Sequence, residues 1–369
     1  MNRVCEDTIQ LIQLETTSRC TLNCATCLKA EYHNSWQERE MGRRLFDCIL
    51  SEIKAFKPLV HLQGWGDPLS HPEILFYIQQ LKAEGLTVNF TTNGSLINSF
   101  IAESLLDCKL DGLTFSMAGI GSGSQGLLRG VGTSEAVKNA IKIVTEAKEN
   151  RQSTVPALAV SYLLTPGTVR DLPAAVSWCR NNGIDSFVSV HLTQAGGQKQ
   201  QDLQYFKWGK RSRYDLFLRV HAHARSLFGK MRLQLKPFHP ILTAVCDKNP
   251  LNSLFISAKG DVSPCVFLCP PVEHGINWRY KGLNHYQKPF IFGNIQDAGL
   301  DEIWACREYK EFRRKFRVRA DYHDRKLVKV SYSLSGSAEL ESAVRAIRSY
   351  FSSHSPPGEC AACAKLDGY

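Results

Sequence analysis

The sequence lacks any run of apolar residues long enough to cross a bilayer, although hydrophobic residues make up 43% of its 369 positions. Because a membrane-spanning helix needs about 20 consecutive apolar residues, we expect no such helix and no membrane partner. The segment from Met1 to Gln10 carries charge and lacks the apolar core of a secretion signal. Together these absences predict a cytoplasmic protein whose apolar residues form a globular core.

The sequence also lacks a visible internal repeat, and no nucleic-acid-binding motif accompanies its excess of basic residues. We therefore expect no nucleic acid partner. The formal net charge is +10, and residues 307–329 hold ten Lys or Arg against four Asp or Glu. This segment is interpreted either as a solvated helix face or as a docking surface for an acidic partner protein or an electron donor.

Apolar and β-branched runs alternate with longer amphipathic segments through the first half of the chain. This order predicts an α/β fold with parallel strands joined by helical crossovers. Six such units predict an open, partial (β/α)6 barrel. The predicted strands are Ile9–Glu15, Leu59–Gln63, Thr87–Thr91, Gly112–Ser116, Ala157–Leu164 and Ser186–Leu192; the predicted helices are Arg43–Phe56, Pro72–Glu84, Ile97–Leu106, Ser134–Asn150 and Val169–Asn182.

The pattern changes after the sixth predicted strand, which indicates a second, smaller domain. We expect residues 1–210 to form the barrel and residues 240–369 to form the second domain, with a basic insertion near 317–358. Within this half the predicted elements are a loop at Gln194–Lys210, a helix at Ser212–Phe228, a strand at Met231–Leu235, a hairpin from Ser253–Ala258 to Val262–Leu268, and a helix at Asp301–Phe316.

The unusual feature of the composition is its thirteen cysteines. In a reducing cytosol they seldom form disulfides, so metal binding or redox chemistry is the leading interpretation. Cys20, Cys24 and Cys27 follow the first predicted strand with C-x3-C-x2-C spacing. Three thiolates on one loop can hold three irons of a [4Fe–4S] cluster and leave the fourth iron open to another ligand. A zinc site with His33 as a fourth ligand is the alternative.

This loop after the first strand resembles that of the radical S-adenosylmethionine (SAM) superfamily, and the resemblance covers roughly residues 8–195. In that family the fold is a partial (β/α)6 barrel, which matches the six predicted units. The resemblance implies that SAM chelates the open iron and is cleaved reductively to methionine and a 5′-deoxyadenosyl radical. The radical would then abstract hydrogen from a substrate, and a reductant such as flavodoxin or ferredoxin would supply electrons.

Further segments at the predicted strand ends resemble SAM-contacting motifs of the same family. Residues 63–68 resemble the GGEP motif, with tryptophan and aspartate replacing a glycine and the glutamate, and residues 91–94 resemble the TNG turn. Arg129-Gly130 resembles an element whose arginine binds the methionyl carboxylate through two parallel hydrogen bonds. The resemblance places His191 and Leu192 near the adenine. The implied SAM-binding residues are Gly64, Trp65, Gly66, Asp67, Asn93, Ser116, Arg129 and Leu192.

A second set of cysteines follows the barrel region. Cys246, Gly260 and Cys265 are spaced C-x13-G-x4-C, and Cys360 and Cys363 form a C-x2-C pair near the end of the sequence. The pattern resembles the twitch domain, a shortened form of the SPASM extension of radical SAM enzymes. Four thiolates close a [4Fe–4S] cluster, so one auxiliary cluster is predicted. A structural zinc site or an incomplete cluster is the alternative.

Two other cysteines leave the ligand set open. Cys269 lies four residues after Cys265, and Cys306 lies in the following predicted helix. Either thiol is able to replace one of the four ligands, and both are otherwise expected to be ordinary buried thiols. Sulfatase-maturating relatives have an aspartate where this chain has Val266, so no catalytic acid or base is predicted.

The reaction itself is predicted only as a class. Residues 62–69 and 116–119 most closely resemble the maturases of tungsten-cofactor oxidoreductases. We expect a radical SAM enzyme that matures a peptide, a protein or a metal-cofactor oxidoreductase, with the auxiliary cluster accepting the electron left on the substrate. The alternatives are a dehydrogenase of a small alcohol and, among non-enzymes, an iron–sulfur electron carrier or a zinc-stabilised binding protein.

Overall fold

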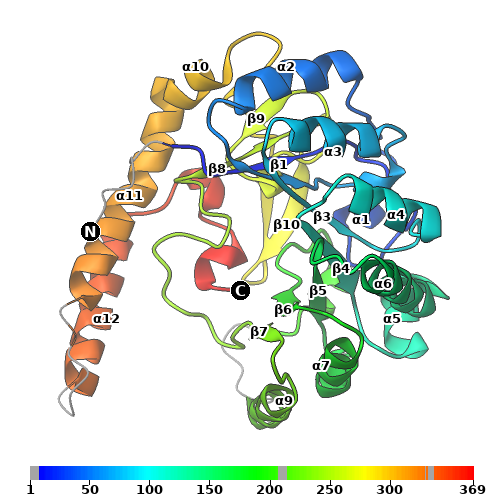
Figure 1. Cartoon of the computed structure of the whole chain (residues 1–369). Helices are drawn as coiled ribbons and strands as arrows, with labels where there is room; N and C mark the ends of the chain where they lie inside the picture. The colour runs from blue at the N-terminus through cyan, green and yellow to red at the C-terminus, as the bar shows by residue number, and fades with distance from the viewer. Residues whose placement is uncertain (1–7, 207–213, 329, 331–335) are drawn as a thin grey trace.

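In the computed structural model, which describes residues 8–206, 214–328, 330 and 336–369, a ten-stranded sheet forms the centre of the molecule (Figure 1). Its order is β12-β9-β8-β1-β2-β3-β4-β5-β6-β7. Strands β1 to β6 are parallel neighbours in chain order, which confirms the six predicted barrel units. They are β1 Leu11–Leu14, β2 Leu59–Leu62, β3 Thr87–Thr92, β4 Gly112–Met117, β5 Ala157–Leu164 and β6 Ser186–His191.

The sheet continues beyond the barrel at both edges. The short strand β7, Arg232–Gln234, pairs parallel with β6, and β8, Ser253–Ile256, pairs parallel with β1. Strands β9, Asp261–Ser263, and β12, Gly293–Asn294, complete the second edge in antiparallel pairing. The predicted hairpin therefore extends the barrel sheet, so hydrogen bonds join the two predicted domains. The division at residues 210 and 240 stays a prediction.

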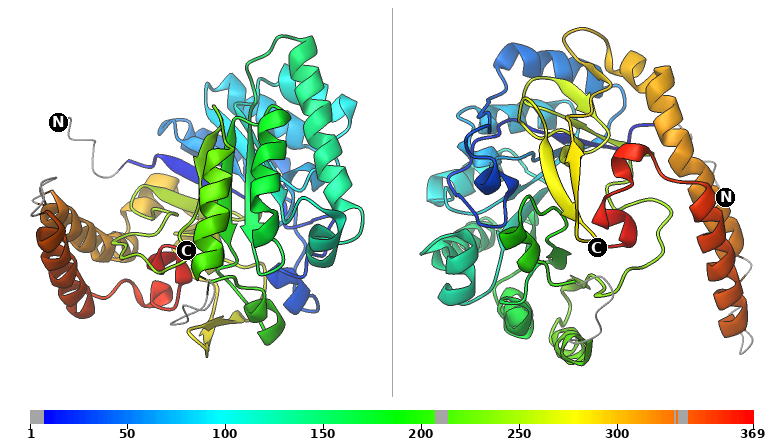
Figure 2. Two further views of the ribbon diagram at one scale, coloured as in Figure 1. Left: turned by 90° about the horizontal axis from the view of Figure 1, so that it is seen from below. Right: turned by 180° about the vertical axis from the view of Figure 1, so that it is seen from behind.

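Helices cover the outside of the barrel, as Figure 2 shows from two sides. Each of the five predicted crossover helices is present, with ends that differ by a few residues. The helices of the barrel region are α1 Leu28–Glu31, α2 Arg43–Ile53, α3 Ile74–Ala83, α4 Ser99–Asp107, α5 Ser122–Arg129, α6 Thr133–Asn150, α7 Leu172–Asn181, α8 Gln198–Asp202 and α9 Tyr214–Ser226. Within the described residues, no helix is long and apolar enough to cross a membrane.

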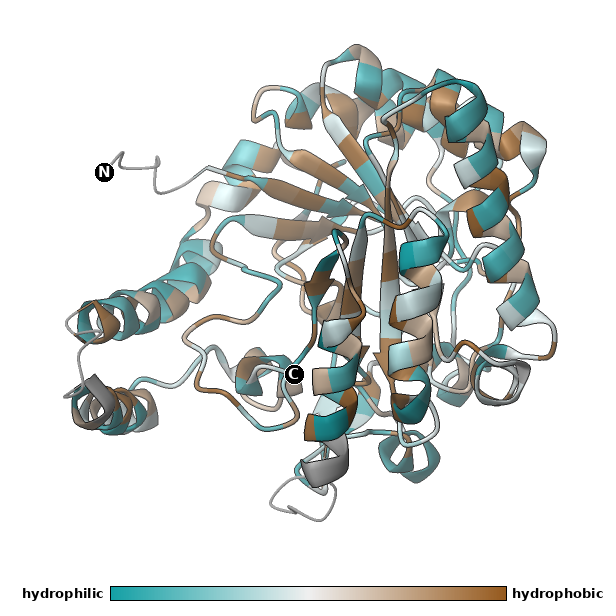
Figure 3. Ribbon diagram, turned by 60° about the horizontal axis from the view of Figure 1, so that its bottom comes forward, coloured by the Kyte–Doolittle hydropathy of each residue, from teal (hydrophilic) through white to brown (hydrophobic). Residues whose placement is uncertain are grey.

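Burial alternates along the barrel strands and separates an apolar outer face from a more polar inner face. In β4 the buried Leu113 and Phe115 alternate with the half-buried Thr114 and Ser116. The buried set belongs to the main core, which also contains helix residues such as Ile141, whereas the half-buried set faces the lumen. Figure 3 shows the hydrophobic residues concentrated on the strands and the hydrophilic ones on the outer helices. The barrel thus keeps an accessible, partly polar interior.

The second half of the chain departs from its predicted elements in four places. The strand predicted at Val262–Leu268 is strand β9 only as far as Ser263, and Val266–Leu268 form a single 3₁₀ turn. The predicted loop at 194–210 contains the short helix α8, and a hairpin that was not predicted is formed by β10, Ile276–Tyr280, and β11, Leu283–Gln287. The predicted helix at 301–316 is divided at Cys306 into α10, Leu300–Ala305, and α11, Arg307–Leu327. Helix α11 packs against α12, Gly336–Ser353, so the described part of the predicted basic insertion is largely a pair of helices.

Candidate active site

The N-terminal loop, by which we mean residues 16–27, leaves the carboxyl end of β1 and carries the three clustered thiols. All three are partly exposed, and Cys27 is the N-cap of α1 with an extended backbone (φ −88°, ψ 140°). The carboxyl ends of parallel barrel strands meet at one edge of the sheet. The loop therefore lies at the mouth of the lumen.

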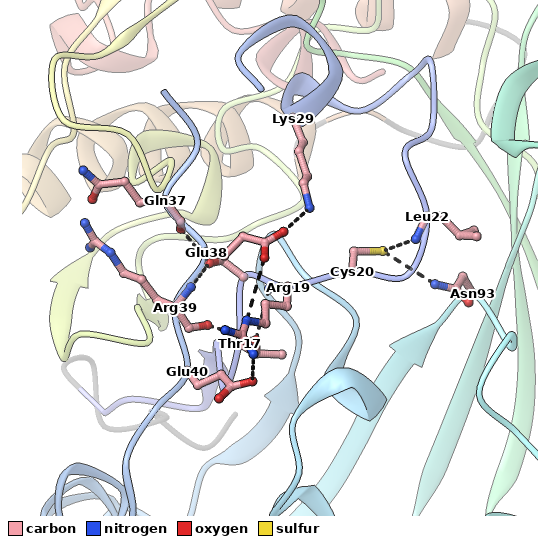
Figure 4. A network of polar contacts seen from close by, with 11 residues as sticks. Thr17, Arg19, Cys20, Leu22, Lys29, Gln37, Glu38, Arg39, Glu40 and Asn93 are labelled. Atoms are coloured by element: carbon pink, nitrogen blue, oxygen red, sulfur yellow. Dashed lines mark hydrogen bonds and ion pairs between the residues drawn. The ribbon is translucent and has the colours of Figure 1, made fainter. Parts of the chain in front are cut away.

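An ion-pair network ties the N-terminal loop to the segment that precedes α2 (Figure 4). Arg19 contacts Glu40 at 2.9 Å and Glu38 at 3.7 Å, and Lys29 contacts Glu38 at 2.6 Å. A β-bridge between Thr17 and Glu40 runs beside these pairs. Exposed ion pairs each add little stability, but several of them together with a backbone bridge fix the path of the loop.

Two amide side chains hold the N-terminal loop from the inner side. Asn93, in the turn after β3, places its Nδ2 3.6 Å from the sulfur of Cys20, as Figure 4 shows. Gln200, a buried residue of α8, donates from Nε2 to the carbonyls of Ala25 at 3.0 Å and Cys27 at 2.8 Å. The backbone that carries the thiols is thus positioned by residues far away in the sequence.

The turn after β2 approaches Glu15 and the N-terminal loop too closely for any side chain at its glycines. A Cβ at Gly64 would lie 2.3 Å from Oε1 of Glu15, and one at Gly66 would lie 2.5 Å from the carbonyl of Thr17. Oε1 of Glu15 accepts a hydrogen bond of 2.8 Å from the backbone N–H of Trp65. Burial raises the pKa of Glu15, and this hydrogen bond opposes that effect. The two glycines therefore permit a close approach of this turn to Glu15 and to the backbone of the N-terminal loop; their predicted contact with SAM stays a prediction.

Asp67 is buried and satisfied by its own chain. Its carboxylate accepts hydrogen bonds from the N–H of Leu69 at 3.1 Å, the hydroxyl of Thr92 at 2.9 Å and the N–H of Asn93 at 2.7 Å. Burial raises the pKa of Asp67, and these bonds lower it. The geometry gives Asp67 the task of joining the β2 and β3 turns; direct contact with SAM stays a prediction.

Arg129, the last residue of α5, has an unsatisfied donor at the mouth of the barrel. Its Nη1 donates to the carbonyl of Ser116 at 3.0 Å. Its Nε is buried and has no hydrogen-bond partner within the described residues. A buried unpaired N–H costs free energy unless a ligand satisfies it, and a guanidinium is suited to a carboxylate. The arrangement fits the predicted contact with the methionyl carboxylate, which stays a prediction.

Leu192 lies in a small apolar cluster beside this arginine. The cluster contains Ala118, Leu128, Leu163 and Leu192, which come from the ends of three barrel strands and from α5. An apolar wall of this kind fits the flat face of a purine, the position predicted for the adenine of SAM.

His191 occupies a different environment from its neighbour Leu192. Its Nε2 lies 2.8 Å from the carbonyl of Pro237, and its ring contacts those of Phe206 and Tyr369. Burial lowers the pKa of His191 to about 4. Successive strand residues point to opposite faces, which explains why His191 supports the C-terminal segment and does not line the apolar cluster.

Burial affects the ionisation of two thiols of the N-terminal loop, Cys20 and Cys27. Burial raises the pKa of Cys27 to about 11, and the neighbouring Cys24 and Cys20 add to this rise. Burial also raises the pKa of Cys20. Metal binding deprotonates such thiols. Across the residues that the structure describes, no group of three His, Cys, Asp or Glu side chains stands in an arrangement that holds a single metal ion.

The second set of predicted ligands converges on one cavity, which we call the auxiliary hollow. Segments separated by more than 90 residues meet there, since Cys265 precedes Cys360 by 95 positions (360 − 265). The wall contains all four predicted auxiliary ligands together with aromatic and lysine side chains. The lining residues that bear on the chemistry are Cys246, Lys248, Cys265, Phe312, Cys360, Cys363 and Lys365.

Positive charge accompanies the four thiols of the auxiliary hollow. Burial raises the pKa of Cys246 to about 11, with repulsion from Cys265 as the second cause. Lys248 opposes the rise at Cys265. Lys365 lines the same wall and contacts Asp247 at 3.1 Å. A four-thiolate cluster carries net negative charge, so the two lysines fit such an occupant.

Cys269 and Cys306, the two alternative ligands of the auxiliary cluster, do not lie in the wall of the auxiliary hollow. Cys306 is the N-cap of α11, and its sulfur accepts a hydrogen bond of 3.4 Å from the N–H of Tyr309. Cys269 is buried and lines a separate cavity with Glu15 and Arg39. Neither lines the auxiliary hollow, and the structure gives each of them another place in the fold.

Trp65 links the two thiol sites. Its indole Nε1 donates to the carbonyls of Val266 at 3.2 Å and Cys269 at 3.0 Å, on the segment that begins with Cys265. Glu15 supports this link, because its Oε2 accepts from the N–H of Ala258 at 3.2 Å. The tryptophan that departs from the family motif therefore holds the SAM-motif turn against the segment carrying an auxiliary ligand.

Four residues that build these sites are not among those predicted from the sequence: Glu15, Gln200, Lys248 and Lys365. The sequence places Glu15 at the end of a predicted strand and Gln200 in a predicted loop. A motif could have singled out neither, because each acts on a segment brought near by the fold. The lysines offered a weak signal, since Lys248 is two residues from Cys246 and Lys365 is two residues from Cys363.

Two family models match the chain at the positions of these two sites. A model of the radical SAM superfamily matches residues 14–179, and a model of the SPASM iron–sulfur cluster-binding domain matches residues 246–326. The first implies a [4Fe–4S] cluster and SAM, and the second implies auxiliary iron–sulfur binding. The C-terminal cysteine pair lies beyond the second match. It is the tertiary structure that places this pair beside Cys246 and Cys265.

Curated proteins and solved structures are similar to the chain over most of its length. The tungsten-containing aldehyde ferredoxin oxidoreductase cofactor-modifying protein of Pyrococcus furiosus is 25% identical over 312 residues, which cover 83% of each protein. The Fe-coproporphyrin III synthase of Methanosarcina barkeri is 22% identical, covering 78% of this chain and 72% of that protein. SuiB of Streptococcus suis, solved with SAM, has a TM-score of 0.60 at 15% identity, over 83% of this chain and 68% of its own. This last likeness shows the fold.

Proposed function

Since the chain belongs to the radical SAM superfamily and is an enzyme of that class, we propose that it modifies a peptide or a protein-bound cofactor by hydrogen abstraction. The relative that modifies a tungsten enzyme's cofactor supports this choice, because it aligns over 83% of both proteins. SuiB, solved also with its precursor peptide, gives the fold a peptide-binding precedent. The observation that carries the proposal is a three-thiol loop beside an unsatisfied arginine at an accessible barrel mouth.

Residues of the barrel mouth would bind and orient SAM. Nε of Arg129 is the donor available for the methionyl carboxylate, while its Nη1 bond to Ser116 keeps the guanidinium in place. The glycines at 64 and 66 let the turn after β2 pack against Glu15 and the thiol-bearing loop, which would hold this turn beside the bound SAM. The cluster around Leu192 would cover the adenine and exclude water from it.

When bound, the cluster and SAM supply a 5′-deoxyadenosyl radical for hydrogen abstraction. The chain's own contribution is rigidity, since Gln200 and Asn93 fix the loop that holds the thiols. At the second site, Lys248 and Lys365 would stabilise the thiolate forms of the four cysteines. A closed set of four thiolates leaves no ligand position for substrate, so the second site is assigned to electron transfer.

Substitution of Arg129 by Gln tests the SAM-binding part of the proposal. Loss of a charge-assisted contact costs about 1.5–3 kcal/mol, so we expect the Kd for SAM to rise about 10- to 100-fold in the reconstituted protein. Equilibrium dialysis under anaerobic conditions measures this. Arg180→Gln, an exposed arginine of α7, is the matched control and should leave the Kd unchanged. Equal effects of both substitutions would contradict the assigned contact.

Fractionation of a cell extract tests the substrate class. The reconstituted protein is given SAM, dithionite and an extract from cells of the source organism that lack the gene, and 5′-deoxyadenosine is measured. The proposal expects the stimulating component to remain above a 3 kDa filter and to be destroyed by protease. A protease-resistant component below the filter cutoff would favour the dehydrogenase of a small alcohol.

A further inference from the structure

The hairpin of β10 and β11 is a two-stranded sheet of its own. In the left view of Figure 2 it is drawn in yellow and projects from the body of the chain. Its turn residues, Lys281 (φ 51°) and Gly282 (φ 84°), both have positive φ, as a type I′ turn requires. With this two-residue turn, Tyr280 and Leu283 form the first hydrogen-bonded pair. Bonded pairs alternate with pairs whose backbone groups point away from the partner strand, so the register shows which groups each strand turns outward.

The outer edge of β10 is satisfied by the barrel. Its outward residues are Asn277 and Arg279. The N–H of Arg279 donates to the carbonyl of Ala195 at 2.7 Å. The N–H of Asn277 donates to the hydroxyl of Tyr32 at 2.6 Å, and that hydroxyl donates to the Asn277 carbonyl at 2.7 Å. Tyr32 is the C-cap of α1 and Ala195 follows β6, so β10 is held at the barrel mouth between the segments that follow the first and sixth strands.

The outer edge of β11 has the same kind of groups without partners. Its outward residues are Asn284 and Tyr286. Both are exposed, and among the described residues the backbone N–H and C=O of each form no hydrogen bond. Proline and charged side chains commonly guard such edges, but β11 contains no Pro, Lys or acidic residue. The nearest guards are Lys281 and Lys288-Pro289, at the two ends of the strand. The strand therefore presents an open backbone edge.

Two large side chains stand beside this open edge. Leu283 is 66% exposed and Tyr286 is 55% exposed. They lie on opposite faces of the hairpin, because successive side chains of a strand alternate. A strand added beside β11 would contact both of them with its own side chains. Such contacts favour β-branched or aromatic residues in the added strand. The edge thus offers main-chain hydrogen bonds for affinity and one side chain on each face for selectivity.

Charge on the hairpin disfavours a second copy of this chain as the occupant. Residues 276–288 contain Arg279, Lys281 and Lys288 and no acidic residue. Lys281 is paired with Asp367 at 3.6 Å, whereas the other two form no ion pair among the described residues. Two copies joined through β11 would bring these like charges together, which opposes their pairing. A folded partner would also need an unpaired strand of its own, whereas an extended peptide has all of its backbone groups available.

We propose that β11 binds an extended segment of the peptide substrate by strand addition, through the outward backbone groups of Asn284 and Tyr286. The occupant, a peptide, rests on the proposed function. Strands in a sheet are about 4.8 Å apart, so the added strand would lie about 10 Å from β10. An extended chain covers about 3.3 Å per residue. At least about three residues would therefore separate this recognition segment from the residue that enters the barrel mouth.

Peptides selected on the reconstituted protein from a phage-displayed library of random dodecapeptides provide the probe. Their Kd is measured by fluorescence anisotropy without SAM. Asn284→Pro removes one outward N–H and leaves the bonded pairs of the hairpin in place, so it should raise the Kd at least about tenfold. Asn284→Ala keeps that N–H and is the matched control, which should change the Kd by less than about threefold. Iron content and Tm of both variants are compared with those of the unsubstituted protein.

N-methylation of the selected peptide, one residue at a time, tests the geometry on the unsubstituted protein. Alternate N–H groups of a strand face the same neighbour, so methylation should weaken binding at every second residue. Hydrogen exchange of residues 283–287 should slow in the complex. Weakening without this period, unchanged exchange in β11, equal effects of the two Asn284 variants, or no enriched peptide would overturn the inference. So would a dimer of this chain that Asn284→Pro dissociates, because β11 would then pair with a second copy.

Failure of this inference is distinguishable from failure of the proposed function, because the binding assays need neither SAM nor turnover. A protease-sensitive substrate without strand addition at β11 would overturn the inference and leave the proposed function standing. A protease-resistant substrate below the filter cutoff would overturn the proposed function, whether or not peptides bind to β11.

Discussion

The N-terminal loop takes its three thiols from eight consecutive positions, residues 20–27, whereas the auxiliary hollow takes four thiols from three separate segments. Cys246 and Cys363 are 117 positions apart (363 − 246). The loop is braced by hydrogen bonds and exposed ion pairs. The hollow is walled by packed side chains such as Phe312 and Trp278.

This contrast explains how differently the two sites depend on the fold. Closing a loop costs entropy that grows with its length, and the step from about 7 to about 117 residues costs about 2–3 kcal/mol more. The N-terminal loop can bring its thiols together with local structure alone. The auxiliary hollow exists only after β8, α11 and the C-terminal segment have packed, so its occupant would in return crosslink the folded chain.

Removal of the three loop thiols should give the largest effect. In Cys20→Ala, Cys24→Ala, Cys27→Ala we expect about eight irons per chain to fall to about four, with 5′-deoxyadenosine formation abolished. Iron, acid-labile sulfide and 5′-deoxyadenosine are measured after anaerobic reconstitution, with Cys48→Ser as the control outside both sites. About four irons before substitution and none afterwards would remove the auxiliary cluster, and zinc in place of iron would overturn both assignments.

Removal of the C-terminal thiols should reduce stability more than removal of the loop thiols. Cys360→Ala, Cys363→Ala also leaves about four irons, yet it releases the long crosslink, so the free energy of unfolding should fall about 2–3 kcal/mol further. Anaerobic denaturant titration of the two reconstituted variants measures this. Equal losses in both would show that the auxiliary site does not crosslink the fold.

The substitution Trp65→Phe removes the hydrogen bonds that link the two thiol sites and leaves every cysteine in place. It keeps most of the aromatic contacts with Trp36 and Phe267 but leaves the carbonyls of Val266 and Cys269 without their indole donor. Loss of buried hydrogen bonds costs about 1–3 kcal/mol, and a chelator should remove the auxiliary iron faster. The control is Trp178→Phe on α7, whose indole has no hydrogen bond within the described residues; it should cost less.

Protonation of His191 at acidic pH should weaken the packing of the C-terminal segment against its ring. Its pKa is lowered to about 4 by burial, below the ordinary value of about 6.5. As pH falls from about 6.5 to 4, the unfolded chain binds a proton that the folded chain excludes, so stability decreases by up to about 3 kcal/mol. Denaturant midpoints from pH 7 to 5 should show this slope in the unsubstituted protein and a smaller slope in His191→Gln.

Strong periodicity made the barrel predictable, but short or glycine-containing helices were not recognised. Helix α5 includes Gly123 and Gly126, residues that oppose helix formation in isolation, and packing against α6 stabilises it nonetheless. Helix α8 has only five residues, too few to show a period. These two helices contact the N-terminal loop, through Leu128 and Gln200, so these two errors fell where the candidate site is built.

The sequence by itself determined the barrel, the three-thiol loop and the four auxiliary cysteines, because periodicity and residue spacing are local and survive in a linear chain. The tertiary structure decided which distant groups meet. It joined β8 to β1, placed Gln200 under the thiol loop and left Nε of Arg129 buried without a partner. It also turned Tyr309, Phe312 and Phe316 of α11 inward, together with Arg313 and Arg319. Such contacts arise because packing the apolar faces together fixes long-range neighbours, which no spacing along the chain encodes.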